Sequence, residues 1–348
     1  MVRLKKSFSR EKGMHLDKKR LVLYGFITLF VISLIACAVI IRNVYQTNLN
    51  PLNNSDSDIV VTVEPGSPPS KIADTLVAKN VIKSDWAFEW YVRNHNYRDE
   101  LKAGTYVLKS SQSIPEIVDV IRSGKVATDL VTILPGKRID QVKSALIKAG
   151  FTEAEVDSAL NPANYAGHPA LTDKPKDSSL EGYLYPESFQ KTAETTAKEI
   201  VGLSLDEMDR YLTPEVRQGF AKQGLSVHEG VTLASIVEQE VSKASDKPTV
   251  AQVFLKRYKD GMMLGADPTA LYGSIVAGKE PSLLYDSPYN TRMHAGLPPG
   301  PIGNVSESSL KAVAFPAETD WLFFVAGDDG VNYFSKTLEE HEALTKQN

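Results

Sequence analysis

The chain has 348 residues and 42% of them are hydrophobic, which suffices for one to three domains with a sizeable core. The formal net charge is −4, but residues 1–42 carry nine Lys or Arg and two acids, which leaves 30 basic and 41 acidic residues in the remainder. An acidic body argues against a nucleic-acid partner. Cys37 is the only cysteine and the six His show no metal-ligand spacing, so we expect no disulfide, metal or cofactor.

Residues 21–41 form an apolar run without a charge or a proline, and a basic tail of residues 1–20 precedes it. At about 1.5 Å per helical residue the run spans roughly 30 Å, the thickness of the hydrocarbon core of a bilayer. The run is longer than the apolar core of a signal peptide, so we expect an uncleaved single-pass anchor. The basic tail predicts a cytoplasmic N-terminus and an exported body. As an alternative, Leu34–Cys37 resembles a lipoprotein processing site, which would place a lipid on Cys37.

Residues 42–57 are polar, lack periodicity and predict a linker. A strand–turn–helix pattern then occurs twice, because Val61–Gly66 (VTVEPG) is repeated as Val131–Gly136 (VTILPG). We expect the two following helices over residues 70–79 and 140–149, with a strand over 104–108 and a helix over 113–123 between them. These elements predict an α+β region over residues 58–155, whose role as scaffold or as polymer-binding surface stays open.

We assign residues 156–348 to a second α+β domain. Its aromatic segment at residues 180–189 is interpreted as structural. Loops dense in turn residues lie between residues 264 and 302 and predict a cleft. The remaining elements expected from periodicity are helices over residues 193–224, 249–258 and 308–314, and two strands, 321–326 and 331–335, joined by a turn at Asp328–Gly330.

The stretch Leu233–Ala244 reads as an amphipathic helix that begins at a capping box, Ser226–Glu229. At about 100° per residue Glu240 falls within the apolar arc, whereas Glu238 falls on the polar side and is expected to be a solvated surface residue. Burial disfavours the charged form of a carboxyl group and raises its pKa, which suits a general acid acting on a glycosidic bond. The alternative for Glu240 is a boundary residue that reaches water.

Five motifs of the second domain carry a resemblance to a known family. They are SLEGYLYPESF (179–189), ASIVEQE (234–240), DPT.LYG (267–273), SPYNT (287–291) and GLPPGPI (296–302). Together, and in this order, they resemble the endolytic murein transglycosylases, the YceG-like family of lytic transglycosylases, over about residues 58–345. The resemblance implies an N-terminal anchor, a LysM-like α+β domain and an α+β catalytic domain with a lysozyme-like catalytic helix.

The resemblance also implies an activity. Such an enzyme cuts nascent peptidoglycan strands between N-acetylmuramic acid and N-acetylglucosamine without using water. The muramic acid's own 6-hydroxyl attacks and leaves a 1,6-anhydro end, which would terminate strand elongation. The implied partners are peptidoglycan strands, the cell (inner) membrane and peptidoglycan synthases, with the catalytic body in the periplasm or another extracytoplasmic space.

Site residues follow from the matching motif positions. Glu240 matches the catalytic position, where one glutamate acts first as acid and then as base. Asp267, Tyr272, Tyr289 and Asn290 fall on motif positions and are expected to bind the sugar, with Glu238 as a supporting residue. For three of them a structural alternative stays open: Asp267 caps a turn, while Tyr289 and Asn290 brace a loop. Gly265 and Arg292 stand where the family usually has a Gln and an aromatic residue.

Two other functions stay open. A hydrolase of the same bond would need two carboxylates, and Asp267 is the candidate for the second. A non-catalytic wall-binding membrane protein would use the repeat region to grip glycan, with the central helix as scaffold.

Overall fold

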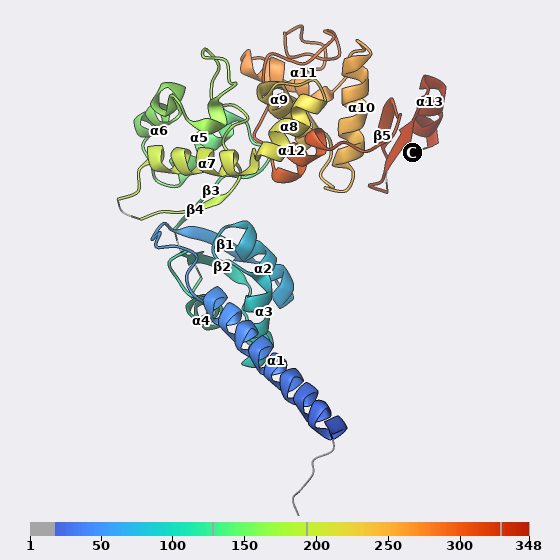
Figure 1. Cartoon of the computed structure of the whole chain (residues 1–348). Helices are drawn as coiled ribbons and strands as arrows, with labels where there is room; N and C mark the ends of the chain where they lie inside the picture. The colour runs from blue at the N-terminus through green and yellow to red at the C-terminus, as the bar shows by residue number, and fades with distance from the viewer. Residues whose placement is uncertain (1–17, 127–128, 193, 328, 348) are drawn as a thin grey trace, which may run out of the picture. The chain divides into compact units, whose positions relative to one another are not determined.

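The computed structural model describes residues 18–126, 129–192, 194–327 and 329–347, although the side chains of residues 18–26 and 28 are outside this description. Most of the predicted basic tail, Ala193 of the predicted helix and Asp328 of the predicted turn therefore lie outside the described residues. The chain divides into two compact units, Met1–Val126 and Ala127–Asn348, here called unit 1 and unit 2 (Figure 1). Helices and three two-stranded antiparallel sheets make up the described parts, which confirms the mixed α+β class.

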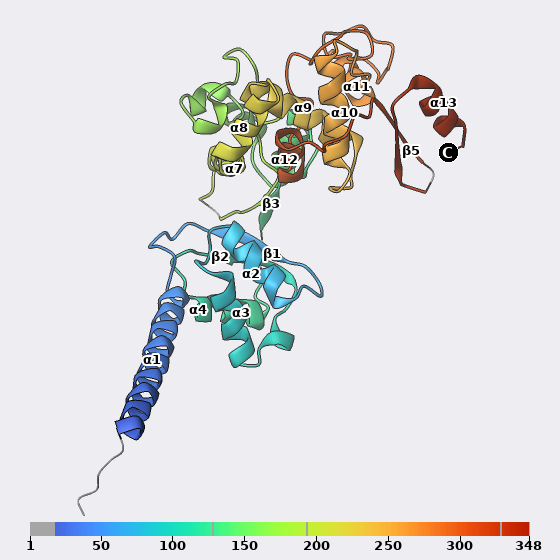
Figure 2. The same cartoon turned by 45° about the vertical axis from the view of Figure 1, so that its right-hand side comes forward.

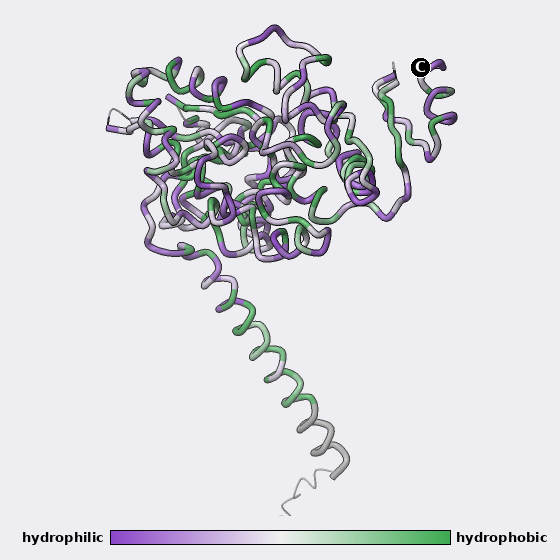
Figure 3. The backbone as a smooth tube through the Cα atoms, turned by 90° about the horizontal axis from the view of Figure 1, so that it is seen from above, coloured by the Kyte–Doolittle hydropathy of each residue, from purple (hydrophilic) through white to green (hydrophobic). Residues whose placement is uncertain are grey.

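Unit 1 begins with a long helix, α1 (Lys18–Leu49), that is coloured as hydrophobic along much of its described length (Figure 3). Among the described residues, α1 is the one helix long and apolar enough to cross a membrane, through its stretch Leu29–Leu49. Residues 42–49 of the predicted linker lie within α1. Tyr45 and Leu49 explain the difference, because both pack against the core of unit 1 and so continue the helix into the folded unit.

The rest of unit 1 follows the order strand, helix, helix, strand, helix. Strand β1 pairs with β2 so that Val61 lies opposite Tyr106, and both residues are fully buried. Helices α2, α3 and α4 cover this pair and bury Leu76, Phe88 and Ile117. The bounds are β1 (Ile59–Val63), α2 (Pro69–Ala78), α3 (Asp85–Asn94), β2 (Gly104–Leu108) and α4 (Ile114–Ser123).

Unit 2 contains the second copy of the repeat and the region predicted to be catalytic (Figures 1 and 2). Its helices are α5 (Ile139–Lys148), α6 (Glu153–Ala159), α7 (Ala197–Tyr211), α8 (Pro214–Lys222), α9 (Val227–Glu240), α10 (Lys247–Lys259), α11 (Asp267–Val276), α12 (Glu307–Ala314) and α13 (Leu338–Gln347). Its strands are β3 (Leu130–Thr132) paired with β4 (Ser188–Gln190), and β5 (Phe323–Ala326) paired with β6 (Asn332–Ser335). The hairpin β5–β6 confirms the two strands expected there.

The two repeat copies fold alike, since each forms a strand, a turn at a glycine with positive φ and a ten-residue helix. They nevertheless belong to different units, so the structure divides the chain after Val126 and not at the predicted boundary of residues 155 and 156. Hydrogen bonds give the reason. Lys137 N donates to Asn304 Oδ1 at 2.8 Å, and Gln239 Nε2 donates to Gly136 O at 2.6 Å. The turn of the second copy is thereby built into unit 2.

The single helix predicted over residues 193–224 is two helices, α7 and α8. The break falls at Thr213, whose hydroxyl accepts a hydrogen bond from Val216 N, and Pro214 follows at the first helical position. A proline there starts a helix readily but cannot continue the preceding one. Helices α8, α9 and α12 then pack closely, because Gly219 of α8 lies against Ala314 and Gly230 of α9 lies against the Phe220 ring.

Gly219→Ala should destabilise the protein. A methyl group there would lie 2.6 Å from Ala314 Cβ and 2.8 Å from Ala314 O, and such overpacking costs about 1–3 kcal/mol. The matched control is Gly202→Ala in α7, where the nearest atom is Tyr165 Cε1 at 4.0 Å, so this change should stabilise by about 0.4–1 kcal/mol. Scanning calorimetry measures both effects, and equal melting temperatures for the two variants would contradict this account of the packing.

Candidate active site

Helix α9 begins as predicted and ends at the residue of greatest interest. Ser226 Oγ accepts a hydrogen bond from Glu229 N at 3.2 Å, and Glu229 Oε2 accepts one from Ser226 N at 2.8 Å, which is the expected capping box. The helix ends at Glu240, four residues before the predicted end, because Val241 adopts extended backbone with φ −137° and ψ 130°. Glu240 thus occupies the C-terminal end of the helix, where the helix dipole disfavours a negative charge.

The Glu240 carboxyl group is partly buried at the end of a largely buried helix. Burial and the negative charge of Asp267 raise the pKa of Glu240 to about 7, against the opposing positive charge of Arg257. The sequence-based expectation of a raised pKa on the apolar arc agrees with this environment, although the charge of Asp267 adds to it.

Arg257 of α10 is the cation that faces Glu240. Its Nε donates to Leu322 O and its Nη1 donates to Leu264 O, each at 2.7 Å, and its guanidinium lies 5.0 Å from the centre of the Phe323 ring. Burial lowers the pKa of Arg257, and the charge of Glu240 partly offsets this. Two fixed hydrogen bonds hold the guanidinium in place whether or not Glu240 is ionised. Sequence reasoning did not single out Arg257, because it lies on a helix outside the five motifs.

Asp267 is the first residue of α11 and forms an ion pair with Arg292. Both side chains are about half exposed, 51% for Asp267 and 44% for Arg292. The structure brings Asp267 close enough to Glu240 for its charge to act on Glu240. It also pairs Asp267 with Arg292, and the aromatic residue usual at position 292 could not form this ion pair.

The motifs DPT and SPYNT are joined by two buried threonines. Thr269 and Thr291 share a hydrogen bond of 2.8 Å between their hydroxyls, and Thr291 Oγ1 also accepts from Ala266 N at 3.1 Å. Asn290 is fully buried and donates to Leu283 O and Tyr285 O. The Asn290 amide thus braces the loop from inside, as the structural alternative expects, and its sugar contact stays a prediction.

A second buried carboxyl group, Glu181, was not identified from the sequence. Glu181 Oε1 accepts from Ile139 N at 3.0 Å, and its Oε2 accepts from the Tyr272 hydroxyl at 3.1 Å. Burial raises the pKa of Glu181 to about 7, although these hydrogen bonds lower it. The sequence did contain a signal for Glu181. It is a charged residue inside an aromatic segment that was interpreted as structural, and a buried charged residue needs hydrogen-bonding partners.

Tyr272 and Tyr289 form an aromatic pair with ring centres 4.8 Å apart. Tyr272 is only 8% exposed and its hydroxyl is bound to Glu181, so it links α11 to the start of α5. Tyr289 is less buried, and burial raises its pKa, as does the charge of Glu181. The structure thus leaves Tyr289 the more accessible of these two predicted sugar-binding residues.

Glu238 is not the solvated surface residue that the helical wheel predicts. Its side chain is 9% exposed, and its Oε2 accepts hydrogen bonds from Ser306 N, from Ser309 Oγ at 2.6 Å and from Lys247 Nζ at 3.1 Å. Burial alone would raise its pKa, but these hydrogen bonds and the Lys247 charge outweigh burial, and the pKa of Glu238 lies below its usual value. The wheel missed this because α12 packs over what would otherwise be the polar side of α9.

Two further motif loops are held on α9. Ser235 Oγ accepts from Ile302 N at 3.0 Å, which attaches the GLPPGPI loop. His228 Nδ1 lies 2.9 Å from the Tyr183 hydroxyl, and its Nε2 lies 3.3 Å from Pro299 O, so the imidazole joins the same loop to the SLEGYLYPESF segment. The five motifs therefore converge on α9, and the arrangement leaves an accessible acid with a near-neutral pKa at the end of a rigid helix. Such a group suits general acid–base chemistry.

Comparisons with known proteins identify the family to which this chain belongs. The model of the YceG-like family matches residues 61–347. An endolytic murein transglycosylase of Bacillus subtilis (strain 168) is 31% identical over 83% of this chain and 84% of that protein, and one of Streptococcus pneumoniae serotype 2 is 29% identical over 83% of this chain and 58% of that protein. The crystal structure of a YceG-like protein from Listeria monocytogenes has a TM-score of 0.54 and 33% identity over 83% of this chain and 100% of that one. The chain belongs to the YceG-like family.

Glu238→Ala should destabilise the protein strongly, since it leaves the Lys247 ammonium, which is only 4% exposed, buried without its ionic partner. Losing one partner of a buried ion pair costs about 3–5 kcal/mol. Because the folded-state pKa of Glu238 is lowered, its contribution to stability is present above the pKa of the unfolded chain and is lost as the pH falls through the folded-state pKa. The destabilisation by Glu238→Ala should therefore shrink in acid.

The control is Glu240→Gln on the same helix. The folded-state pKa of Glu240 is raised, so ionisation of Glu240 destabilises the fold as the pH rises from the unfolded-state pKa to about 7. Glu240→Gln should accordingly leave stability unchanged in acid and increase it at pH 8. Unfolding in urea at both pH values measures the two variants, and a large loss of stability in Glu240→Gln would contradict the assignment of the two glutamates.

Proposed function

We propose that this protein is a membrane-anchored lytic transglycosylase that cleaves peptidoglycan strands between N-acetylmuramic acid and N-acetylglucosamine, with Glu240 as the acid–base catalyst. One observation carries the proposal: the Glu240 carboxyl ends a rigid buried helix and has a pKa near 7. The names of the relatives, endolytic murein transglycosylase, support the same substrate and reaction class.

The reaction needs one group that first gives and then takes a proton. Protonated Glu240 donates its proton to the glycosidic oxygen as the bond from C1 of the muramic acid breaks. The resulting Glu240 carboxylate then accepts the proton of the muramic acid C6 hydroxyl while that oxygen bonds to C1. The products are a free 4-hydroxyl and a 1,6-anhydro end, and Glu240 regains its proton. A pKa near the working pH serves both steps.

Arg257 and Asp267 act on the proton affinity of Glu240 in opposite directions. The negative charge of Asp267 keeps Glu240 protonated before the first step. The positive charge of Arg257 stabilises the carboxylate between the two steps, and its two hydrogen bonds to carbonyl groups keep it from moving away. An attacking hydroxyl already attached to the substrate removes the need to position a water molecule.

The hydrolase alternative requires a second carboxylate that activates water. Glu181 does not suit that role, because it is only 7% exposed and its oxygens are engaged by Ile139 N and the Tyr272 hydroxyl. Asp267 is exposed enough, but it is paired with Arg292. The favoured reaction is therefore the transglycosylase, in which Asp267 tunes Glu240.

Unit 1 supports an anchored, strand-binding role. Helix α1 would hold the body on the extracytoplasmic face of the cell membrane, where nascent strands and their synthases meet, and cleavage there would terminate strand growth. Unit 1 also has an open pocket of about 380 Å³, a size that suits a sugar unit. Its lining combines the apolar residues Pro68, Pro69 and Val92 with the polar and charged residues Ser70, Glu89, Arg93, Asn96, Arg98 and Asp99. A LysM-like, glycan-binding unit 1 is part of this proposal.

Glu240→Gln should lower the rate of glycan cleavage by at least about 10²–10⁴-fold, the usual contribution of general acid–base catalysis. Release of soluble fragments from purified peptidoglycan, identified by mass spectrometry, measures it. Wild-type products should carry anhydro-muramic ends. Reducing muramic ends would favour the hydrolase, and retained glycan binding without cleavage by wild type would favour the wall-binding protein.

Asp267→Asn should shift the alkaline limb of the pH–rate profile to lower pH. The substitution removes a negative charge that raises the pKa of Glu240, so the acid deprotonates earlier as the pH rises. The matched control is Asp286→Asn, an exposed loop aspartate paired with His294, which should leave the profile unchanged. An unshifted limb in Asp267→Asn would show that Asp267 does not act on Glu240.

A further inference from the structure

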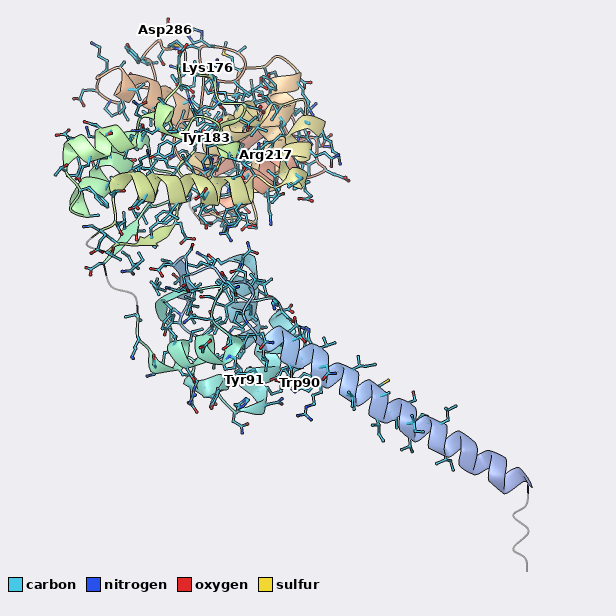
Figure 4. The ribbon with its side chains drawn as sticks, turned by 60° about the vertical axis from the view of Figure 1, so that its left-hand side comes forward. Trp90, Tyr91, Lys176, Tyr183, Arg217 and Asp286 are labelled. Carbon is cyan, nitrogen blue, oxygen red and sulfur yellow. The ribbon has the colours of Figure 1, made fainter. Side chains whose placement is uncertain are left out.

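Three aromatic side chains form a cluster where α1 enters unit 1. The ring of Tyr45 in α1 lies 5.9 Å from the ring of Trp86 and 5.0 Å from that of Trp90, and the two tryptophan rings of α3 are 5.7 Å apart. Trp86 is 39% exposed and Trp90 is 36% exposed. Figure 4 shows Trp90 at the edge of unit 1 beside α1. We call this cluster the exit patch.

The exit patch has a defined depth relative to the apolar run of α1. The charge-free run ends at Ile41, Arg42 follows, and Tyr45 lies four residues beyond Ile41. Four helical residues rise about 6 Å. The headgroup region on each side of a bilayer is roughly 5–8 Å thick, since a bilayer is about 40–45 Å across with a 30 Å core. The stretch Leu29–Leu49 contains Arg42, whereas residues 21–41 carry no charge and therefore suit the core better. With residues 21–41 in the core, the exit patch falls within the headgroup region.

We infer that the exit patch is a lipid-contacting surface through which unit 1 rests on the outer face of the membrane. This inference rests on the membrane anchoring proposed above. Tryptophan and tyrosine are enriched at the level of the headgroups, because their rings are apolar while the indole N–H and the phenol hydroxyl are polar. Arg42, exposed one turn before Tyr45, is placed to reach lipid phosphate groups.

The exit patch and α1 together fix the orientation of the folded part of unit 1 relative to the membrane. Helix α1 is continuous to Leu49, which packs against the unit 1 core. After the helix, Asn53 N donates to Ser110 O at 3.2 Å and Ser110 Oγ donates to Asn53 Oδ1 at 2.7 Å, so the chain stays attached beyond the helix end. The folded part of unit 1 is therefore attached to α1 at two places, at Leu49 and at Asn53, and is not connected to it through a flexible linker.

A lipid occupant suits the exit patch better than a sugar does. Exposed apolar residues continue from the patch along α1 through Val44, Ile41 and Ile40, which are 47%, 52% and 60% exposed. This continuity joins the aromatic rings to the surface that faces the hydrocarbon core. A glycan strand would need a polar rim at the same place, and the pocket of unit 1 provides such a rim elsewhere, around Arg98 and Asp99.

Fluorescence quenching by brominated lipids tests the inference on the full chain reconstituted in nanodiscs. Trp321→Phe leaves Trp86 and Trp90 as the two emitters, and adding Trp86→Phe or Trp90→Phe isolates each of them. Nanodiscs contain phosphatidylcholine with bromine either near the ester groups or near the middle of the bilayer. We expect a loss of Trp86 and Trp90 emission that is greater with the shallow bromine, together with a blue shift relative to exposed tryptophan.

The control variant carries Phe30→Trp with Phe at positions 86, 90 and 321. Position 30 lies eleven residues before Ile41, about 16 Å along the helix and close to the bilayer centre, so its emission should be lost mainly to the deep bromine. Quenching at position 30 with full emission from Trp86 and Trp90 would overturn the inference and leave the anchor intact. Full emission at position 30 would overturn both.

Discussion

Unit 2 depends on one constraint: the carboxylic acid Glu240 lies at the end of a largely buried helix, and none of the described residues forms a direct ion pair with it. Leu233, Ile236 and Val237 fix α9 in the core, and Glu240 follows where the helix stops. Burial, the helix terminus and the charge of Asp267 all favour the protonated acid. The Arg257 charge opposes them, so the pKa lies near neutrality and not far above it.

The same helix contains the opposite case two residues earlier. Glu238 is also removed from solvent, yet three hydrogen-bond donors and Lys247 surround its Oε2 and keep it ionised. Its task is to fix the start of α12 and the chain around Ser306. Burial therefore does not by itself decide the charge of a carboxyl group. The number of donors directed at its charged form does.

The sequence was sufficient for much of this account. Apolar periodicity and turn residues predicted the strands of unit 1, the capping box of α9 and the hairpin β5–β6, because those features are local. It was insufficient where distant segments meet. Glu238 is covered by α12, the second repeat copy packs against Asn304, and Glu181 is bound by Tyr272 from a helix 91 residues away. None of these pairings leaves a periodic signal in one stretch of chain.

The most direct test of the account is the titration of Glu240 itself. Infrared spectra of protein with ¹³C-labelled glutamate carboxyl groups show a carbonyl band for each protonated acid, and the band missing from Glu240→Gln belongs to Glu240. Subtracting Glu181→Gln in the same way separates the other buried carboxyl group. We expect the Glu240 band to persist in mild acid and to disappear with a midpoint near pH 7 as the pH rises. A midpoint near the ordinary value of about 4.3 would contradict it.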